Sequence, residues 1–89
     1  MDEKELYSIL GYVTISKYRR DILKALGDDA KIPSQIAKKL NIKTTQVSGG
    51  LADLKKKNLV VCVNEEVRKG RVYRCTPEGL KILEYLKDD

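Results

Sequence analysis

Residues 33–57 read PSQIAKKLNIKTTQVSGGLADLKKK and indicate two helices separated by a tight turn. Pro33 suits the first turn of a helix that ends near Leu40. Only three residues then precede Thr44, whose hydroxyl suits the N-cap of a second helix through about Lys57. The helical spacing places six apolar residues on the inner faces of this pair: Ile36, Ala37, Leu40, Val47, Leu51 and Leu54.

A hairpin and a last helix are predicted after this pair. Residues 59–63 are an apolar run of strand composition, and residues 72–75 form a second short strand beyond a charged loop. Thr76 and Pro77 then read as the N-cap and first residue of a C-terminal helix.

Two further helices are predicted before residue 33. The N-terminal segment, residues 1–15, has apolar side chains on one helical face, at Leu6, Ile9, Leu10 and Val13. Ser16 suits the N-cap of the next helix, which Gly27 ends. We expect its inner stripe to contain Tyr18, Ile22, Leu23, Ala25 and Leu26.

This order of elements predicts a mostly α fold with a small β-hairpin, an α+β chain arranged as a winged helix-turn-helix. We assign residues 1–89 to one domain. Its parts are the N-terminal segment, a three-helix core with the wing at residues 16–76, and a C-terminal helix at residues 77–89.

Positive charge is concentrated in one part of the chain. The net charge of the whole chain is +5, but residues 31–74 contain eleven Lys or Arg against three acidic residues. A basic surface of this kind favours a polyanionic partner, and double-stranded DNA fits the predicted elements best.

Composition argues against several other classes of protein. The chain has two cysteines, Cys62 and Cys75, and no histidine, so it has neither the common zinc spacings nor a histidine-dependent catalytic arrangement. We therefore predict no catalysis, no metal and no cofactor. Both cysteines are interpreted as small apolar residues, with a redox switch as the alternative. Because no apolar run approaches a membrane span and no secretory signal is evident, we expect a cytoplasmic protein without membrane contact.

The same residues resemble those of the small archaeal winged helix-turn-helix transcriptional regulators, broadly of the MarR and ArsR type. In the first half of the chain, the resemblance is carried by Ser16, Lys17, Tyr18, Arg19, Ile22, Leu23, Ala25, Leu26, Pro33, Ser34, Ile36, Ala37, Leu40 and Ile42. In the second half, it is carried by Val47, Ser48, Leu51, Leu54, Leu59, Val60, Gly70, Arg71, Tyr73, Thr76 and Gly79. The resemblance implies a DNA-binding regulator of transcription.

The expected DNA contacts come from two elements. We predict that the recognition helix, residues 44–57, enters the major groove and that the wing, residues 64–72, meets phosphate or the minor groove. The predicted contacts on the helix are Thr44, Thr45, Gln46, Ser48, Gly49 and Lys56, and those on the wing are Arg68, Lys69 and Arg71. Thr45, Gln46 and Ser48 are the predicted base readers because their side chains both donate and accept hydrogen bonds.

Gly49 and Gly50 depart from the family pattern, and two interpretations stay open. Small residues here would let the helix backbone approach DNA closely. Alternatively, this surface has little sequence preference. A pair of glycines inside a helix costs about 0.5 to 1 kcal/mol each relative to alanine, so the pair needs an explanation.

Both ends of the chain are more apolar than a single buried stripe requires. We therefore predict a homodimer through Leu6, Leu10, Leu83 and Leu86. The alternative is that the two ends pack on each other within one chain. No small-molecule effector is predicted.

A second function is consistent with the same elements. A winged helix can serve as a protein–protein interaction module that binds DNA weakly or without sequence preference. The sequence favours DNA binding because the basic hairpin and the basic helix are neighbours in the chain.

Overall fold

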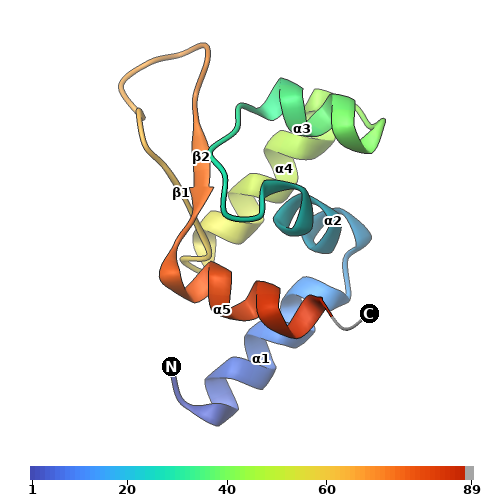
Figure 1. Ribbon diagram of the computed structural model, residues 1–89, viewed down its shortest axis with the longest axis vertical. Coiled ribbons are helices and arrows are strands. Elements are labelled where there is room, and N and C mark those ends of the chain that lie inside the picture. Colours follow the sequence, from blue (N-terminus) through green and yellow to red (C-terminus); the bar gives the residue numbers. More distant parts are fainter. Residues whose placement is uncertain (88–89) are drawn as a thin grey trace.

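Five helices and a two-stranded antiparallel hairpin make up residues 1–87, the part of the chain that this computed structural model describes (Figure 1). The elements in order are α1 (Glu3–Thr14), α2 (Lys17–Leu26), α3 (Pro33–Leu40), α4 (Thr44–Lys56), β1 (Val60–Cys62), β2 (Tyr73–Cys75) and α5 (Pro77–Leu86). The predicted fold class and element order are confirmed. Residues 88–89 of the predicted C-terminal segment lie outside the described residues.

Local sequence signals fix several of the helix ends. The Ser16 hydroxyl accepts a hydrogen bond from the backbone N–H of Arg19 at 3.3 Å, and that of Thr76 accepts one from Gly79 at 3.0 Å. Each bond satisfies an amide that the first helical turn leaves without a partner. Asn58 has a φ of 59°, the left-handed conformation that ends the turn after α4.

The core is built around α2, which packs against each of the other helices and against β2. Its side chains Ile22, Leu23 and Leu26 are fully buried, and within residues 1–87 no polar or charged residue is buried. Tyr18 was expected to join this inner stripe, but it is 41% exposed. That expectation was wrong because Tyr18 lies in the first turn of α2, where the helix extends beyond the core.

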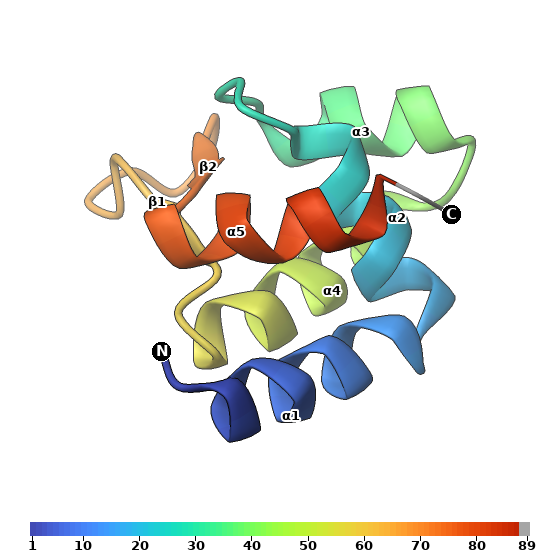
Figure 2. The same cartoon turned by 60° about the horizontal axis from the view of Figure 1, so that its bottom comes forward.

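The two ends of the chain pack on each other within one molecule. Helices α1 and α5 lie together at the end of the molecule away from α3 and the hairpin tip (Figures 1 and 2). Leu6, Leu83 and Leu86 are buried there, and Leu10 is half-buried against the same core. These four residues, proposed above for a dimer, are therefore covered without a second chain. The exposed apolar side chains of the two helices are instead Tyr7, Leu80 and Tyr85.

The two cysteines lie on the inner face of the hairpin as free, buried thiols. In the strand register Cys75 faces Val60 and Cys62 faces Tyr73, so the cysteines are not directly opposite each other. Burial, with the negative charge of Asp28 nearby, raises the pKa of the Cys75 thiol to about 11. This thiol is therefore protonated at neutral pH and packs as a small apolar side chain.

Arg19 ties three helices together from within α2. Its Nε donates to Asp53 Oδ2 of α4 at 3.1 Å, and its Nη1 donates to the carbonyl of Tyr12 in α1 at 2.9 Å. The guanidinium also stacks over the Tyr12 ring, 3.9 Å from the ring centroid. Arg19 is thus committed to holding α4 in place. Within residues 1–87, Arg20 pairs only with its neighbour Asp21, at 3.6 Å.

We expect Arg19→Ala to lower the free energy of unfolding by about 1 to 3 kcal/mol, because it removes two hydrogen bonds and a stacked contact in a partly buried network. Arg20→Ala is the matched control and should change it by about 0.5 kcal/mol or less, as for an exposed ion pair. Urea denaturation followed by circular dichroism measures both. Equal effects of the two substitutions would contradict the structural role of Arg19.

Candidate nucleic-acid interface

The helix–turn–helix unit is formed by α3, residues 41–43 and α4, with the turn length that the sequence predicted. Asn41 ends α3 with a φ of 57°, and the Ile42 amide then donates to the carbonyl of Ala37 at 3.1 Å. The Ile42 side chain packs against the core. These contacts fix the direction in which the chain enters α4.

Helix α4 begins differently from the prediction. The N-cap is Lys43, and Thr44 is already the first helical residue, so the expectation of a Thr44 cap was wrong. The physical reason is Gln46, whose Oε1 accepts the backbone N–H of Lys43 at 3.0 Å, the bond that the third helical residue makes in a capping box. The side-chain amide of Gln46 also donates to the hydroxyl of Tyr18 at 2.8 Å. Gln46 is half-buried, and both the oxygen and the NH₂ group of its side chain are engaged in hydrogen bonds.

A groove of about 440 Å³ lies between the starts of α3 and α4 and the tip of the wing. It brings together five of the predicted contacts, Thr44, Ser48, Arg68, Lys69 and Arg71. The other residues that line it are Ile32, Pro33, Ser34, Gly70 and Tyr73. Two helix N-termini and three cationic side chains therefore border one concave surface, which is an arrangement that favours anions.

The remaining predicted contacts lie outside this groove. Thr45 and Gly49 are exposed on α4, whereas Gln46 is turned toward Tyr18. Lys56 is exposed twelve residues beyond Thr44, about 18 Å along the axis of α4. The structure thus places Lys56 at the opposite end of α4 from the groove.

The two glycines of α4 have different surroundings. A side chain at Gly50 would place its Cβ 2.3 Å from Cδ1 of the buried Ile22, so Gly50 is what allows α4 to lie close against α2. A Cβ at Gly49 would meet nothing within 4 Å and would point to solvent. Packing therefore explains Gly50 but not Gly49.

We expect Gly50→Ala to destabilise the fold by about 1 to 3 kcal/mol, because Ile22 has to move within a packed core. Gly49→Ala should instead stabilise it by about 0.5 to 1 kcal/mol through helix propensity alone. Thermal denaturation of the two variants beside the unaltered chain measures the difference. A loss of stability in Gly49→Ala would mean that its surroundings are not open.

Asn64 organises the wing from its base. Its side-chain Nδ2 donates to the carbonyl of Gly70 at 3.1 Å, and its Oδ1 accepts the backbone N–H of Val72 at 2.8 Å. Gly70 has a φ of 71°, the left-handed conformation that the tip of the loop requires. Asn64 was not among the predicted site residues, although Asn at a loop entrance is a recognised turn signal.

Arg71 also contributes to the shape of the wing. Its Nε donates to the carbonyl of Val67 at 2.7 Å and its Nη2 to the carbonyl of Glu65 at 3.2 Å. The guanidinium therefore closes the loop as well as lining the groove. Arg68 and Lys69 are exposed at the tip, and within residues 1–87 neither has a hydrogen bond or ion pair with another side chain.

Two further links join the wing to the rest of the domain. Lys55 near the end of α4 forms an ion pair with Glu65, which lowers the pKa of the Glu65 carboxyl and raises that of the Lys55 amine. At the start of β2, Lys31 and Tyr73 exchange backbone hydrogen bonds of 2.9 and 2.8 Å. The hairpin is therefore linked to α4 through Glu65 and to the segment that leads into α3 through Tyr73.

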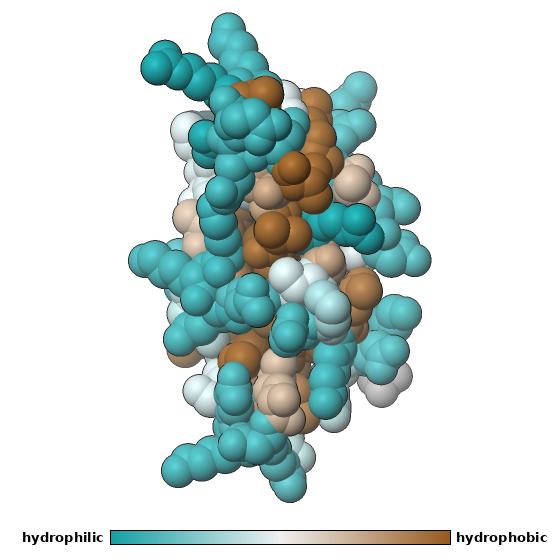
Figure 3. All heavy atoms as spheres, turned by 90° about the vertical axis from the view of Figure 1, so that its left-hand side faces the viewer, coloured by the Kyte–Doolittle hydropathy of each residue, from teal (hydrophilic) through white to brown (hydrophobic). Residues whose placement is uncertain are grey.

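The outer face of the hairpin carries apolar side chains and one cation, Arg74, which is paired across the strands with Val61. Figure 3 views the molecule from the hairpin side and shows a band of hydrophobic surface between projecting hydrophilic side chains. Val61 and Val63 are the exposed apolar residues of this part of the chain. Arg68 and Lys69 are exposed cations of the wing tip, and Arg74 lies further down on β2.

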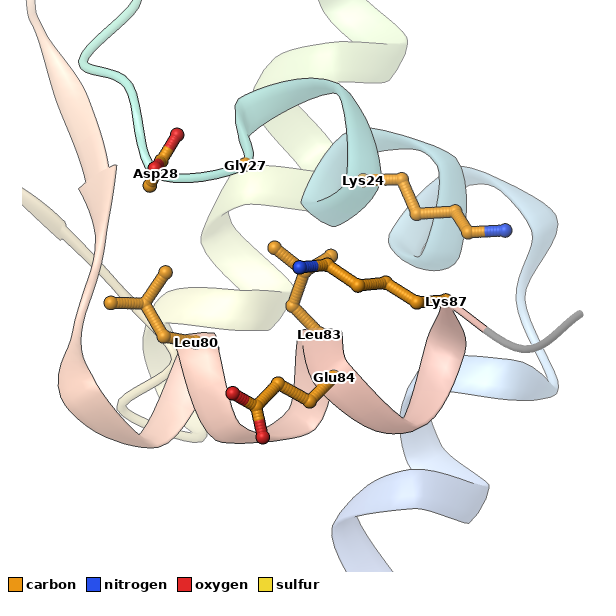
Figure 4. Close-up of a pocket in the computed structure, with 7 residues that line it drawn as sticks. All are labelled: Lys24, Gly27, Asp28, Leu80, Leu83, Glu84 and Lys87. Atoms are coloured by element: carbon orange, nitrogen blue, oxygen red, sulfur yellow. The ribbon is translucent and has the colours of Figure 1, made fainter.

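A second hollow, of about 610 Å³, lies between the end of α2 and α5 (Figure 4). Its floor contains Leu80 and Leu83. Its rim consists of Lys24, Gly27, Asp28, Glu84 and Lys87, in which two cations and two anions balance. It shares no lining residue with the groove at α4 and lacks that groove's excess of positive charge.

Other kinds of site have no counterpart in residues 1–87. Across these residues, no three His, Cys, Asp or Glu side chains gather in a way that would bind a metal ion. None of the helices in this part of the chain has the length and apolar character needed to cross a membrane.

A helix–turn–helix unit with a basic hairpin beside its second helix defines the winged class of helix–turn–helix proteins. The chain belongs to the winged helix-turn-helix family, whose model matches residues 14–88. Among curated protein sequences, none matches the chain.

Two solved structures of HlyU from Vibrio cholerae are similar to this chain. The reduced form has 21% sequence identity and the other structure 20%, each with a TM-score of 0.68. In both comparisons the match covers 99% of this chain and 96% of the HlyU chain. At this identity the likeness supports the fold.

Proposed function

We propose that the protein binds double-stranded DNA as a transcriptional regulator, with α4 in the major groove and the wing on phosphate or in the minor groove. The observation that carries the proposal is the groove that joins Thr44 and Ser48 of α4 to Arg68 and Lys69 of the wing. Membership in the winged helix-turn-helix family supports it. No catalytic role is part of this proposal.

The proposed contacts have two different tasks: base contacts read the sequence of the duplex, and phosphate contacts position the protein on it. An α-helix fits the major groove, where each base pair presents a distinct set of donors and acceptors. Cations that flank the helix bind phosphates and set its orientation on the duplex. Arg68 and Lys69 are free for the second task, and the exposed Thr45 and Ser48 for the first.

The proposal includes three finer points. We place the protein among regulators of the MarR and ArsR type, acting in the cytoplasm. We also propose a homodimer, because a two-fold arrangement would set two recognition helices about one DNA turn, roughly 34 Å, apart. The exposed Tyr7, Leu80 and Tyr85 are the apolar side chains of α1 and α5 available to such a contact.

Binding to a duplex measured by fluorescence anisotropy tests the central claim. Because each phosphate contact releases about 0.9 of a counterion, six contacts should weaken binding about a thousandfold between roughly 50 and 200 mM salt. Arg68→Ala with Lys69→Ala should lower the affinity about tenfold and reduce the salt slope by about 2.

The control for that double variant is Lys24→Ala with Lys87→Ala. It removes the same charge from the other hollow and should leave the salt slope almost unchanged. An affinity for duplex that does not respond to salt would contradict the proposal. Absence of binding at low salt would favour the protein interaction module, for which the exposed Val61 and Val63 provide a surface.

Analytical ultracentrifugation tests the dimer. We expect a species of about twice the 10.1 kDa chain mass at high micromolar concentration. Tyr85→Glu should convert it to the single chain because burying an unpaired carboxylate in an interface is costly. Val61→Glu is the control on the hairpin and should leave the dimer intact. A 10.1 kDa species alone at that concentration would overturn this part of the proposal.

A further inference from the structure

Tyr18 lies beside the start of α4, at the end of that helix that borders the groove. It is the second residue of α2 and is 41% exposed. Its hydroxyl oxygen accepts the hydrogen bond from Gln46 Nε2 at 2.8 Å. Residues two apart on a helix point about 200° apart, so Gln46 and Tyr18 lie on the flank of α4 opposite to the groove residues Thr44 and Ser48, with the exposed Thr45 between the two flanks.

The hydrogen of this hydroxyl remains available for another partner. A tyrosine hydroxyl both donates and accepts, and Gln46 uses its accepting side. Within residues 1–87, the hydrogen bond from Gln46 is the one this hydroxyl makes. Its donor side can therefore serve a ligand outside the chain.

Gln46 is poorly placed to read a base. A glutamine recognises adenine by offering its carbonyl oxygen and its NH₂ group together. Both groups are engaged here, the oxygen with the Lys43 amide at 3.0 Å and the NH₂ group with Tyr18. Reading a base would break the cap of α4 and release Tyr18.

We propose that Tyr18 donates its hydroxyl hydrogen to a phosphate oxygen of the bound duplex and that Gln46 is a positioning residue that orients it. This assignment rests on the DNA binding proposed above. It transfers base discrimination to the short side chains of Thr44, Thr45 and Ser48, which are exposed on α4.

Tyr18→Phe tests the phosphate contact because it removes only the hydroxyl. We expect a loss of affinity of about fivefold that is the same for every duplex in a panel of different sequences. The slope of log K against log salt should stay unchanged, since a neutral donor displaces no counterion. Thr14→Val, which removes an exposed hydroxyl at the end of α1, is the control and should have no effect.

Gln46→Ala tests the positioning role. It should weaken binding while leaving the rank order of the duplexes unchanged, and its effect should be smaller in the Tyr18→Phe background than in the unaltered chain. Gln46→Glu keeps an acceptor for the Lys43 amide, but its carboxylate would accept the Tyr18 hydroxyl hydrogen instead of donating to the oxygen, so it preserves the cap while reversing the positioning contact. It should also lose less affinity in the Tyr18→Phe background.

The possible results separate the Tyr18 contact from DNA binding itself. If the unaltered chain binds DNA and Tyr18→Phe binds equally well, the Tyr18 contact is wrong and DNA binding stands. A changed rank order in Gln46→Ala would mean that Gln46 reads a base. No binding of any duplex by the unaltered chain would overturn both proposals together.

Discussion

The close approach of α4 to α2 at Gly50 determines the geometry of the rest of the molecule. With no side chain at this position, the backbone of α4 lies against the buried Ile22. The Arg19–Asp53 ion pair, 3.1 Å long, holds the same two helices together at the next turn of α4. Because the groove is bordered by the first turns of α4, any shift of this helix would change the distance between Thr44 and the wing. Helix packing and the Arg19–Asp53 ion pair thus together set the position of α4 at the proposed interface.

The basic residues of the chain divide into two groups with different tasks. Arg19, Arg71 and Lys55 have partners within the chain and maintain the positions of α4 and the wing. Arg68 and Lys69 project from the tip of the hairpin toward the groove. A high positive charge in the sequence therefore overstates the number of cations available to a ligand. Arg68 and Lys69 lie where two helices begin, which strengthens the attraction of that surface for an anion.

The order of the elements was predictable from the sequence because its signals are local. Ser16 and Thr76 cap helices within three residues of themselves, and Asn58 stops a helix through its own backbone conformation. The roles of Tyr18 and Gln46 were not predictable, since their hydrogen bond joins residues 28 positions apart. An apolar stripe also does not reveal which surface will cover it. The leucines of α1 and α5 therefore suggested a second chain, although Leu6, Leu83 and Leu86 lie in the core of one molecule with Leu10 packed against it.

The backbone bridge between Lys31 and Tyr73 restrains how far the wing can move relative to α3. It joins the residues that lead into α3 directly to the returning strand of the hairpin. The spacing between the start of α3 and the base of the wing is therefore restrained, because the two cannot move apart without breaking these paired amides. A bound duplex would have to supply the adjustment by bending or by narrowing a groove. DNA sequences that deform at low energetic cost would fit this restrained surface better, even at base pairs that no side chain touches.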